Sequence, residues 1–374
     1  MELIHLIYDH PQNPWLGGGA ALRAKAISSF FVQNGDKTHF VSGGFPKCGQ
    51  NEGADQVQYH FTSFSKNYLL SRLLFSLKAG FIVKKLKKTN KIDLLVEDIS
   101  IFNIIFPKFF WNGPIISLVH NYLGRQSFKK LGIFGIIPFL MERHYLKHRK
   151  NFIAVSEALK KRILKLNPSA NVTVIHNGID EAAFSYAVQP SANKIGYIGR
   201  IEINQKGLDT LVQALSILKA NHFPFKALLI GGGKDEPALK KMISKMELDD
   251  FIEITGRLDE KRFARLSECR IVCMPSRFEG WGIAAIESAA EGIPVIAADI
   301  EGLNEAVLDG QTGILIQATP EKLAEVIKNL STDSAKIEQL SQSAKSHAAN
   351  FRWEKIAAEQ RALYTSLIQD CHSI

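Results

Sequence analysis

Short apolar runs alternate with longer amphipathic runs along this chain, and that alternation is typical of parallel α/β sheets. The apolar runs predict buried strands, whereas segments in which apolar residues recur every three or four positions predict helices. In the first half, the predicted strands are 3–8, 38–43, 92–98, 115–120, 151–156 and 171–178. The predicted helices of that half are 20–34, 68–88, 131–147 and 157–166. The first half is therefore predicted to form one doubly wound domain.

The second half repeats this rhythm and predicts another doubly wound domain. Its predicted strands are 194–199, 226–233, 251–256 and 271–276, and a helix and a further strand follow at 284–299. Between the halves, residues 180–193 lose the periodicity and contain Pro190. We therefore predict a Rossmann-like domain at 1–180, a linker at 181–193 and a second such domain at 194–350. A helix within 351–374 is expected to pack back toward the first domain.

Composition favours a globular protein without a membrane span. The 374 residues are 46% hydrophobic and 22% charged, which is typical of a folded chain with more than one core. The most apolar stretch, 101–120, is interrupted by Lys108, two prolines and a glycine, so it does not predict a transmembrane helix. The N-terminus lacks the basic segment of a signal peptide, and four scattered cysteines do not suggest a disulfide framework. We therefore expect a soluble protein of a reducing cytoplasm.

Charge is distributed unevenly between the two halves. Residues 1–190 contain 24 lysines and arginines against 12 acidic residues, a net +12, whereas the rest has 22 against 25, a net −3. Four lysines, Lys84, Lys85, Lys87 and Lys88, end the predicted helix 68–88. They either complement the helix dipole and keep the protein soluble, or they dock the domain on an anionic membrane surface.

The stretch 276–287, SRFEGWGIAAIE, places two acids beside a glycine-rich turn between a predicted strand and a predicted helix. Ligands of open α/β sheets bind at such turns, because the carboxyl ends of strands and the N-termini of helices meet there. Glu279 and Glu287 suit hydroxyl groups, since an ionised carboxylate accepts hydrogen bonds and can take two from a vicinal diol. Backbone N–H groups from Gly280 to Ile283 could contact an anion at the same helix N-terminus.

Two basic residues occupy the turn after the predicted strand 194–199. Gly199 and Arg200 end that strand, and Lys206 precedes the helix that begins at Leu208. A planar guanidinium and a compact ammonium together suit a diphosphate, although such charges also occur on ordinary surface loops. A diphosphate flanked by hydroxyl-bearing groups is a nucleotide sugar. The two turns together therefore predict a nucleotide-sugar site.

Two further candidates lie in the first half, and the residues alone leave both ambiguous. The loop LGGGAAL at 16–22 contains Gly18 and Gly19, which suit either a phosphate-binding loop or a tight turn. His120 ends a predicted strand on the ligand side, where it is either a structural or a functional histidine. No Asp-x-Asp and no His-Glu-x-x-His occurs in the sequence, so no catalytic metal is predicted.

Several motifs together resemble glycosyltransferase family 4, whose members transfer sugars with retention of anomeric configuration. The resemblance rests on SLVHN at 117–121, VIHNGID at 174–180, GRIEINQKGLDTL at 199–211, and the stretch 275–316 with its two acids spaced E-x7-E. It covers nearly the whole chain, and the motifs of the second half are the specific ones. It implies an α/β fold of the GT-B type, two Rossmann-like doubly wound parallel-sheet domains facing a central cleft.

The resemblance also implies a role for each residue of the site. Arg200 and Lys206 would hold the donor's diphosphate and stabilise its departure, and Glu287 would hold the ribose hydroxyls. Glu279 would contact hydroxyls of the donor sugar near the reacting carbon, with His120 beside that sugar. The other implied donor-binding residues are Gly18, Gly19, Gly199, Gly280, Trp281, Gly282 and Ile283. Trp281 departs from the phenylalanine usual in this turn, a change that leaves its backbone role intact.

The sequence therefore predicts a cytoplasmic, retaining glycosyltransferase that needs no metal and no cofactor besides its donor. It is expected to move a sugar from a UDP- or GDP-sugar to a glycan or lipid-linked acceptor, in bacterial surface polysaccharide or lipopolysaccharide biosynthesis. The basic first domain could hold it peripherally on the inner face of the cell membrane. One alternative function is that of a sugar-nucleotide epimerase of the same fold, which would need an acid/base set for proton abstraction. A nucleic-acid-binding protein would need a recognition signature that this sequence lacks.

Overall fold

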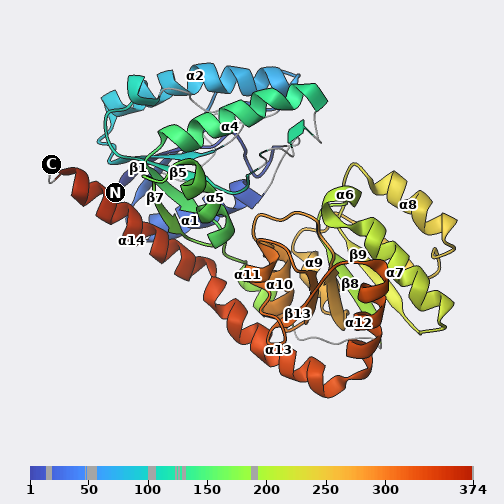
Figure 1. The fold of residues 1–374 in the computed structure, drawn as a ribbon. Coiled ribbons are helices and arrows are strands. Elements are labelled where there is room, and N and C mark those ends of the chain that lie inside the picture. The colour runs from blue at the N-terminus through green and yellow to red at the C-terminus, as the bar shows by residue number, and fades with distance from the viewer. Residues whose placement is uncertain are drawn as a thin grey trace. The chain divides into compact units, whose positions relative to one another are not determined.

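The computed structural model describes residues 1–13, 19–46, 48, 57–99, 107–122, 124, 127–128, 132–186 and 193–372. The chain folds into two compact units (Figure 1). The first unit combines Met1–Asn177 with the C-terminal segment Trp353–Ile374, and the second is Gly178–Arg352. Each unit contains its own parallel sheet and its own buried apolar core.

The first unit is built on a seven-stranded parallel sheet in the order β3-β2-β1-β4-β5-β6-β7. Its strands are β1 (Glu2–Leu6), β2 (Lys37–Ser42), β3 (Val57–Phe61), β4 (Leu94–Asp98), β5 (Ile115–Val119), β6 (Asn151–Ala154) and β7 (Asn171–Val174). The chain moves outward from β1 to one edge and then from β4 to the other. The strand order therefore reverses between β1 and β4, which is where ligands bind in sheets of this kind.

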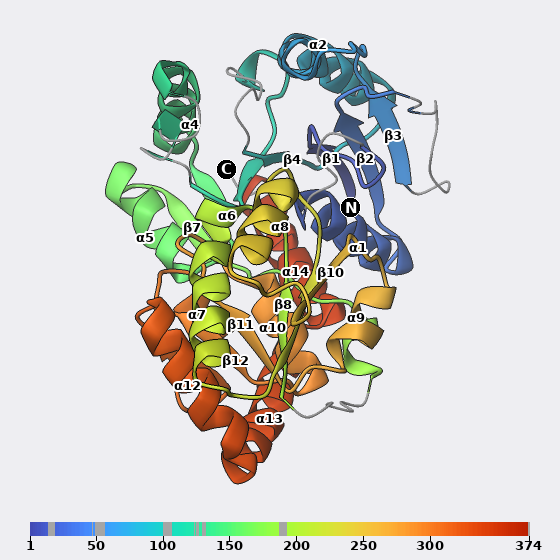
Figure 2. The same ribbon diagram turned by 90° about the vertical axis from the view of Figure 1, so that its right-hand side faces the viewer.

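Helices cover both faces of this sheet. Those of the first unit are α1 (Gly19–Gln33), α2 (Tyr68–Thr89), α4 (Ile136–His148), α5 (Glu157–Leu166) and α14 (Trp353–His372), with short 3-10 turns η1 (Pro107–Phe109) and η2 (Gly132–Gly135). Figures 1 and 2 show α2 and α4 on one side of the sheet and α1 and α14 on the other. Phe75, Ala79 and Val83 of α2 pack on the buried side chains of β1, β2 and β4.

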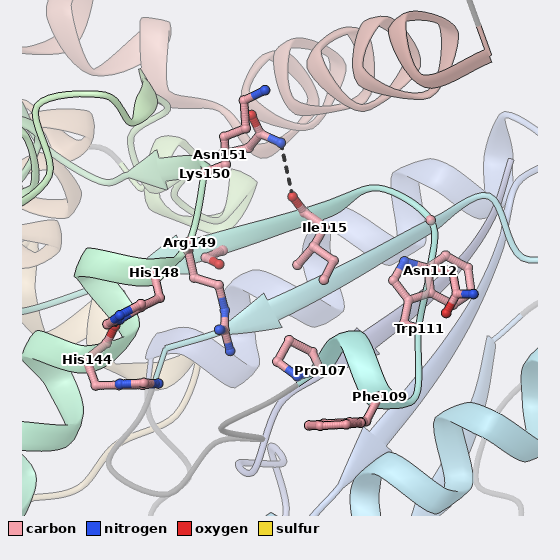
Figure 3. Close-up of a pocket in the computed structure, with 12 residues that line it drawn as sticks. Pro107, Phe109, Trp111, Asn112, Ile115, His144, His148, Arg149, Lys150 and Asn151 are labelled. Atoms are coloured by element: carbon pink, nitrogen blue, oxygen red, sulfur yellow. Dashed lines mark hydrogen bonds between the residues drawn. The ribbon is translucent and has the colours of Figure 1, made fainter. Parts of the chain in front are cut away.

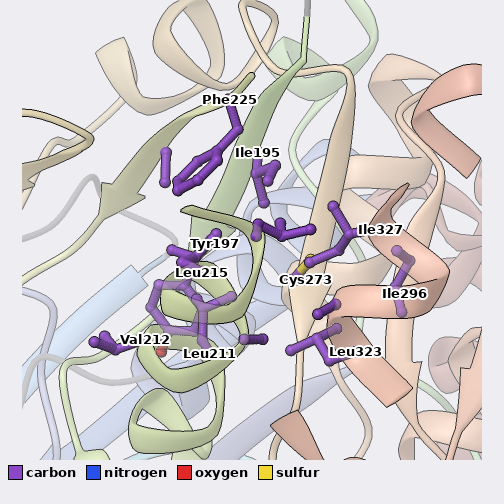
Figure 4. Packing of buried hydrophobic residues seen from close by; sticks show 14 of the residues in the cluster. Ile195, Tyr197, Leu211, Val212, Leu215, Phe225, Cys273, Ile296, Leu323 and Ile327 are labelled. Atoms are coloured by element: carbon purple, nitrogen blue, oxygen red, sulfur yellow. The ribbon is translucent and has the colours of Figure 1, made fainter. Parts of the chain in front are cut away.

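The second unit is built on a six-stranded parallel sheet in the order β10-β9-β8-β11-β12-β13. Its strands are β8 (Lys194–Ile198), β9 (Lys226–Ile230), β10 (Ile252–Gly256), β11 (Ile271–Met274), β12 (Val295–Ala298) and β13 (Gly313–Ile316). The helices are α6 (Ile203–Lys206), α7 (Leu208–Ala220), α8 (Glu236–Lys245), α9 (Lys261–Leu266), α10 (Ile283–Glu291), α11 (Leu303–Ala306), α12 (Pro320–Thr332) and α13 (Ser334–Ala348). Side chains of α7 and α12 interdigitate with those of β8, β11 and β12 in the core (Figure 4).

The predicted fold class, two doubly wound parallel α/β domains, is confirmed, and the borders of the units differ from the predicted ones. The first unit ends at Asn177 rather than at residue 180, and the described part of the predicted linker 181–193 belongs to the second unit. Ile179 N–H donates a hydrogen bond of 2.8 Å to the Phe351 carbonyl, and η3 (Glu181–Phe184) packs against α10. The remainder of the predicted linker, 187–192, lies outside the described residues. Helix α14 packs against α1 within the first unit.

Candidate active site

The candidate site of the second unit lies where the strand order of its sheet reverses. Strands β8 and β11 are neighbours, and the chain proceeds outward from each toward opposite edges. Gly199 and Arg200 follow the carboxyl end of β8, and Ser276 to Glu279 follow that of β11. The crevice outside the carboxyl ends of such strands is the expected ligand position in an open α/β sheet.

Lys206 and Glu279 form an ion pair at this point. Lys206 Nζ lies 2.6 Å from Glu279 Oε1, and the Ser276 hydroxyl donates a hydrogen bond of 2.9 Å to the same oxygen. The two charged side chains are only 13% and 9% exposed, so the pair is shielded from bulk water. A cation and a carboxylate are thus held side by side in a place of low local dielectric, where charge acts more strongly on a ligand.

A glycine fixes the position of this lysine. Gly207 joins α6 to α7 in the left-handed conformation, with φ +64°. A Cβ atom there would lie 1.9 Å from the Pro275 carbonyl oxygen, so only glycine permits this close approach. The corner before α7 therefore rests on the backbone that immediately precedes Ser276, and this contact brings Lys206 to Glu279.

Arg200 lies on the exposed side of the same turn. Its side chain is 65% exposed and its guanidinium donates to Glu202 Oε1 at 2.8 Å. The Tyr197 hydroxyl donates a hydrogen bond of 2.7 Å to the Arg200 carbonyl, which fixes the backbone of the turn. Burial raises the pKa of Tyr197, so this hydroxyl stays a neutral donor. The structure places the two predicted cations on one turn, one in a shielded ion pair and the other toward solvent.

Glu287 is held by a residue that the sequence did not single out. Its Oε1 accepts a hydrogen bond of 2.9 Å from Arg262 of α9, and the same guanidinium nitrogen lies 3.4 Å from Asp180. Arg262 also stacks over the Phe263 ring at 4.2 Å. Burial raises the pKa of Glu287, and the charge of Arg262 opposes that rise. Arg262 therefore favours the ionised, hydrogen-bond-accepting form of Glu287.

The turn between the two acids presents its backbone at the start of α10. Gly282, the N-cap, adopts φ +92°, and Ile283 is the first helical residue. The Trp281 side chain is 2% exposed and packs edge-on against Phe351 with ring centroids 4.9 Å apart. Because the indole is buried in the core, Gly280, Trp281 and Gly282 offer a ligand mainly backbone groups.

In the first unit, the half-buried His120 follows β5 and lies beside Asp98 and His5, two buried residues of the strands β4 and β1 between which the strand order reverses. His120 Nε2 lies 3.4 Å from Asp98 Oδ2, and the other oxygen of Asp98 lies 3.2 Å from His5 Nε2. Burial alone would raise the pKa of Asp98, but the two adjacent imidazoles bring it well below its usual range. Gly19 is the first residue of α1, whereas Gly18 lies outside the described residues.

A separate hollow of about 940 Å³ lies near the amino ends of strands β5 and β6 of the first sheet (Figure 3). It is lined by residues that precede β5 and β6, among them Phe109, Trp111, His144, His148 and Lys150. Strand starts lie opposite the carboxyl edge where His120 is found. None of the predicted site residues that the structure describes lines this hollow.

Glu291 lies one helical turn beyond Glu287 on α10 and is fully buried. Among the described residues, neither of its carboxyl oxygens has a hydrogen-bond partner. Burial, reinforced by the negative charge of Glu287, raises the pKa of Glu291 to about 9. The folded protein therefore holds this side chain as the neutral acid at neutral pH.

Replacing Glu291 with glutamine is expected to stabilise the protein increasingly as pH rises. Between the ordinary glutamate pKa and about 9, the folded state keeps a proton that the unfolded chain releases, so the wild-type free energy of unfolding falls with rising pH. Glutamine has the same shape and does not titrate. Denaturant unfolding should show about 1–3 kcal/mol in favour of Glu291→Gln at pH 8 and almost no difference near pH 4.5.

A matched control is Glu253→Gln, because Glu253 is an exposed partner of Arg265 in the same unit. This change should produce no gain that grows with pH. A constant difference between Glu291→Gln and wild type from pH 5 to 8 would show that Glu291 is ionised in the folded protein.

Two family models together match almost the whole chain. The model described as Glycosyltransferase Family 4 matches residues 17–183, and the one described as Glycosyl transferases group 1 matches residues 178–347. The boundary between the two matches coincides closely with the start of the second unit at Gly178.

Curated proteins show similarity of sequence, and solved structures show similarity of fold. The chain is 27% identical over 266 residues to the glycogen synthase of Mycobacterium tuberculosis, a match that covers 68% of this chain and 64% of that protein. It is 31% identical over 258 residues to an uncharacterized glycosyltransferase of Methanocaldococcus jannaschii, covering 68% of this chain and 67% of that one. The Anabaena HepE structure in complex with UDP and glucose superposes with a TM-score of 0.76 at 18% identity, covering 98% of this chain and 100% of that one.

Proposed function

This chain belongs to glycosyltransferase family 4 and has the GT-B fold, and from that membership we propose that it is a retaining enzyme that uses a nucleotide-diphosphate sugar. The proposed acceptor is a hydroxyl of a glycan or of a lipid-linked glycan. The observation that carries the proposal is the shielded Lys206–Glu279 pair at the strand-order reversal of the second unit. A diphosphate requires positive charge, and a sugar requires hydrogen-bond acceptors, and this pair supplies both within one site.

The proposed donor pose follows from these groups. Lys206 and Arg200 hold the diphosphate, Glu279 accepts from hydroxyls of the donor sugar, and Glu287 accepts from the ribose hydroxyls. Backbone N–H groups at the start of α10 add contacts to the phosphate, because a helix N-terminus carries partial positive charge. The HepE complex with UDP and glucose supports a UDP-sugar as the first donor to test.

The proposed chemistry is departure of the nucleoside diphosphate while an acceptor hydroxyl attacks the same face of the sugar. The bond from the anomeric carbon to the diphosphate oxygen breaks, the bond to the acceptor oxygen forms, and the departing phosphate takes the acceptor's proton. Lys206 and Arg200 stabilise the negative charge that grows on the departing diphosphate. Because two fixed cations perform this task, we propose that transfer needs no divalent metal. His120 is proposed to lie by the sugar at the reaction centre.

The proposed setting is bacterial surface polysaccharide or lipopolysaccharide assembly at the inner face of the cell membrane. Within the described ranges, no helix has both the length and the apolar character that a bilayer span requires. The excess of basic residues in 1–190 supports peripheral attachment to an anionic surface. In this setting a lipid-linked acceptor would be presented at the membrane.

The anomeric configuration of the product tests this proposal. The enzyme is incubated with an α-linked UDP-sugar and a glycan acceptor in EDTA, and the new linkage is read by its proton NMR coupling. An α-linked product formed in EDTA is expected. A β-linked product would refute retention, and a reaction that stops in EDTA and resumes with added magnesium would refute metal independence.

A further inference from the structure

Exposed large apolar side chains are concentrated in the first unit. Of the thirteen such side chains among the described residues, eleven fall within residues 64–140. They are Phe64, Leu70, Leu73, Leu77, Phe81, Phe109, Ile133, Phe134, Ile136, Ile137 and Leu140. The described part of the second unit contributes only Tyr186. Single exposed apolar residues without a role would be distributed over both units. Their concentration in one segment therefore marks an interaction site.

Helix α2 is apolar on two opposite sides. Leu70, Leu73, Leu77 and Phe81 follow helical spacing and form one stripe, and they are between 45% and 65% exposed. Phe75, Ala79 and Val83 form the other stripe, which is fully buried on the sheet. The core accounts for the second stripe and leaves the first largely exposed to solvent, with the Phe81 ring edge-on to that of Phe110.

The start of α4 adds a second group on the same side of the sheet (Figures 1 and 2). Ile133 and Phe134 of η2 are 81% and 75% exposed, and Ile136, Ile137 and Leu140 in the first turns of α4 are 41% to 56% exposed. Pro138 and the later residues Tyr145 and Leu146 are the buried residues of this helix. We call the exposed apolar residues of α2, η2 and α4 the α2/α4 face.

Basic residues accompany the α2/α4 face. Helix α2 contains five lysines and one arginine and has no acidic residue, and Lys84, Lys85, Lys87 and Lys88 lie exposed at its C-terminal end. The one acid of α4, Glu142, accepts a hydrogen bond of 2.8 Å from the Gly124 N–H. The hollow beside the end of α4 adds Lys150 (Figure 3). A second copy of this chain would bring like charges together, so the face is complementary to an anionic partner.

We infer that the α2/α4 face lies in the headgroup region of an anionic lipid bilayer. Apolar side chains enter the boundary between headgroups and acyl chains, while the lysines contact lipid phosphates, as in other interfacial helices. The inference deepens the proposed function by naming the surface that brings the enzyme to a lipid-linked acceptor. Only the reason for membrane binding rests on the proposed function, whereas the binding itself does not. The apolar residues supply the insertion, which lysines at the end of α2 do not provide by themselves.

Vesicle co-sedimentation of the full chain tests this inference without donor or acceptor, so its result is independent of glycosyl transfer. The vesicles are phosphatidylcholine alone, or phosphatidylcholine with about one third phosphatidylglycerol. Two insertion variants are Ile133→Ser/Phe134→Ser and Leu73→Ser/Leu77→Ser, and the charge variant changes Lys84, Lys85 and Lys88 to glutamine. The matched control is Leu22→Ser, which removes a 51% exposed leucine from α1 on the opposite side of the same sheet.

Wild type and Leu22→Ser should bind the anionic vesicles alike and phosphatidylcholine vesicles weakly. Each insertion variant should bind about tenfold or more weakly at unchanged thermal stability, and the charge variant should lose the preference for anionic lipid. Absence of wild-type binding at low salt would overturn the inference. It would also be overturned if wild type sedimented as a dimer that the insertion variants dissociate, because the face would then be a contact between copies.

Discussion

Replacing Lys206 with alanine is expected to lower turnover about 100-fold while the second unit stays folded. The change removes the shielded cation of the Lys206–Glu279 pair. In the proposed mechanism this cation makes a charge-assisted contact with the departing diphosphate. Such contacts contribute about 2–4 kcal/mol of transition-state stabilisation. The measurement is the rate of nucleoside diphosphate release at saturating donor and acceptor. Arg200→Ala, at the exposed side of the turn, should lower the same rate about 30-fold.

Lys194→Ala is the matched control for this prediction. Lys194 also forms a short ion pair in the second unit, with Glu268, but it lies at the amino end of β8. Loss of its charge should leave turnover near the wild-type value. If Lys206→Ala retained more than about half of the wild-type turnover with an unchanged melting temperature, the diphosphate role of Lys206 would be wrong.

The second large effect is expected from Glu287 and its partner Arg262. Glu287→Ala should raise the Kd of the nucleoside diphosphate about 10- to 100-fold and change turnover less, because a ribose contact is similar in the ground and transition states. Arg262→Gln should act through Glu287. Without the guanidinium, burial raises the pKa of Glu287 unopposed, so the ionised fraction falls as pH is lowered. Nucleotide affinity of Arg262→Gln should therefore weaken from pH 8 to pH 6 more steeply than that of wild type.

Isothermal titration calorimetry at several pH values separates a positioning role of Arg262 from a structural one. The double variant Arg262→Gln/Glu287→Ala should bind the nucleoside diphosphate no more weakly than Glu287→Ala alone, because both changes act on the Glu287 carboxylate. Glu253→Ala, which breaks an exposed ion pair with Arg265, serves as the control and should leave nucleotide binding unchanged. Additive losses in the double variant, or a pH profile of Arg262→Gln parallel to that of wild type, would refute the assigned role.

Periodicity predicted most of the elements that position the site. The predicted helix 157–166 coincides with α5, because Ser156 caps it and its apolar residues keep helical spacing. The strand β3 was not predicted, since Val57–Phe61 includes Gln58 and His60 and pairs only at an edge of the sheet. The exact start of the second unit was also missed. Ile179 near the start of this unit contacts Phe351 near its end, and a contact between residues so far apart in the sequence carries no local signal.

The site itself was predictable only where its chemistry is local. The turns that carry Lys206, Glu279 and Glu287 follow strands and begin helices, so sequence spacing identifies them. Arg262 comes from a different helix and ordinary amphipathic residues surround it, which gives no sequence signal for its contact with Glu287. Asp98 had a signal that was not used, because it ends the strand next to that of His120 at the same edge of the sheet.

The α2/α4 face shows a further limit of periodicity. Helix α2 was predicted at nearly its observed bounds, yet its apolar residues lie on two opposite sides. Sequence alone does not distinguish the stripe that packs on the sheet from the stripe that stays exposed. The sequence therefore identified only the lysine cluster as a candidate membrane contact, whereas the structure adds exposed apolar residues on η2 and α4.

The central claim is that the second unit binds a nucleotide-diphosphate sugar through Lys206 without a metal. Isothermal titration of wild type, Lys206→Ala and Lys194→Ala with UDP, GDP, ADP and their sugars, all in EDTA, tests it most directly. We predict that wild type and Lys194→Ala bind one of these nucleotides equally well, and that Lys206→Ala binds it about 30-fold or more weakly. Failure of wild type to bind any of them in EDTA, or equal binding by Lys206→Ala, would contradict the claim.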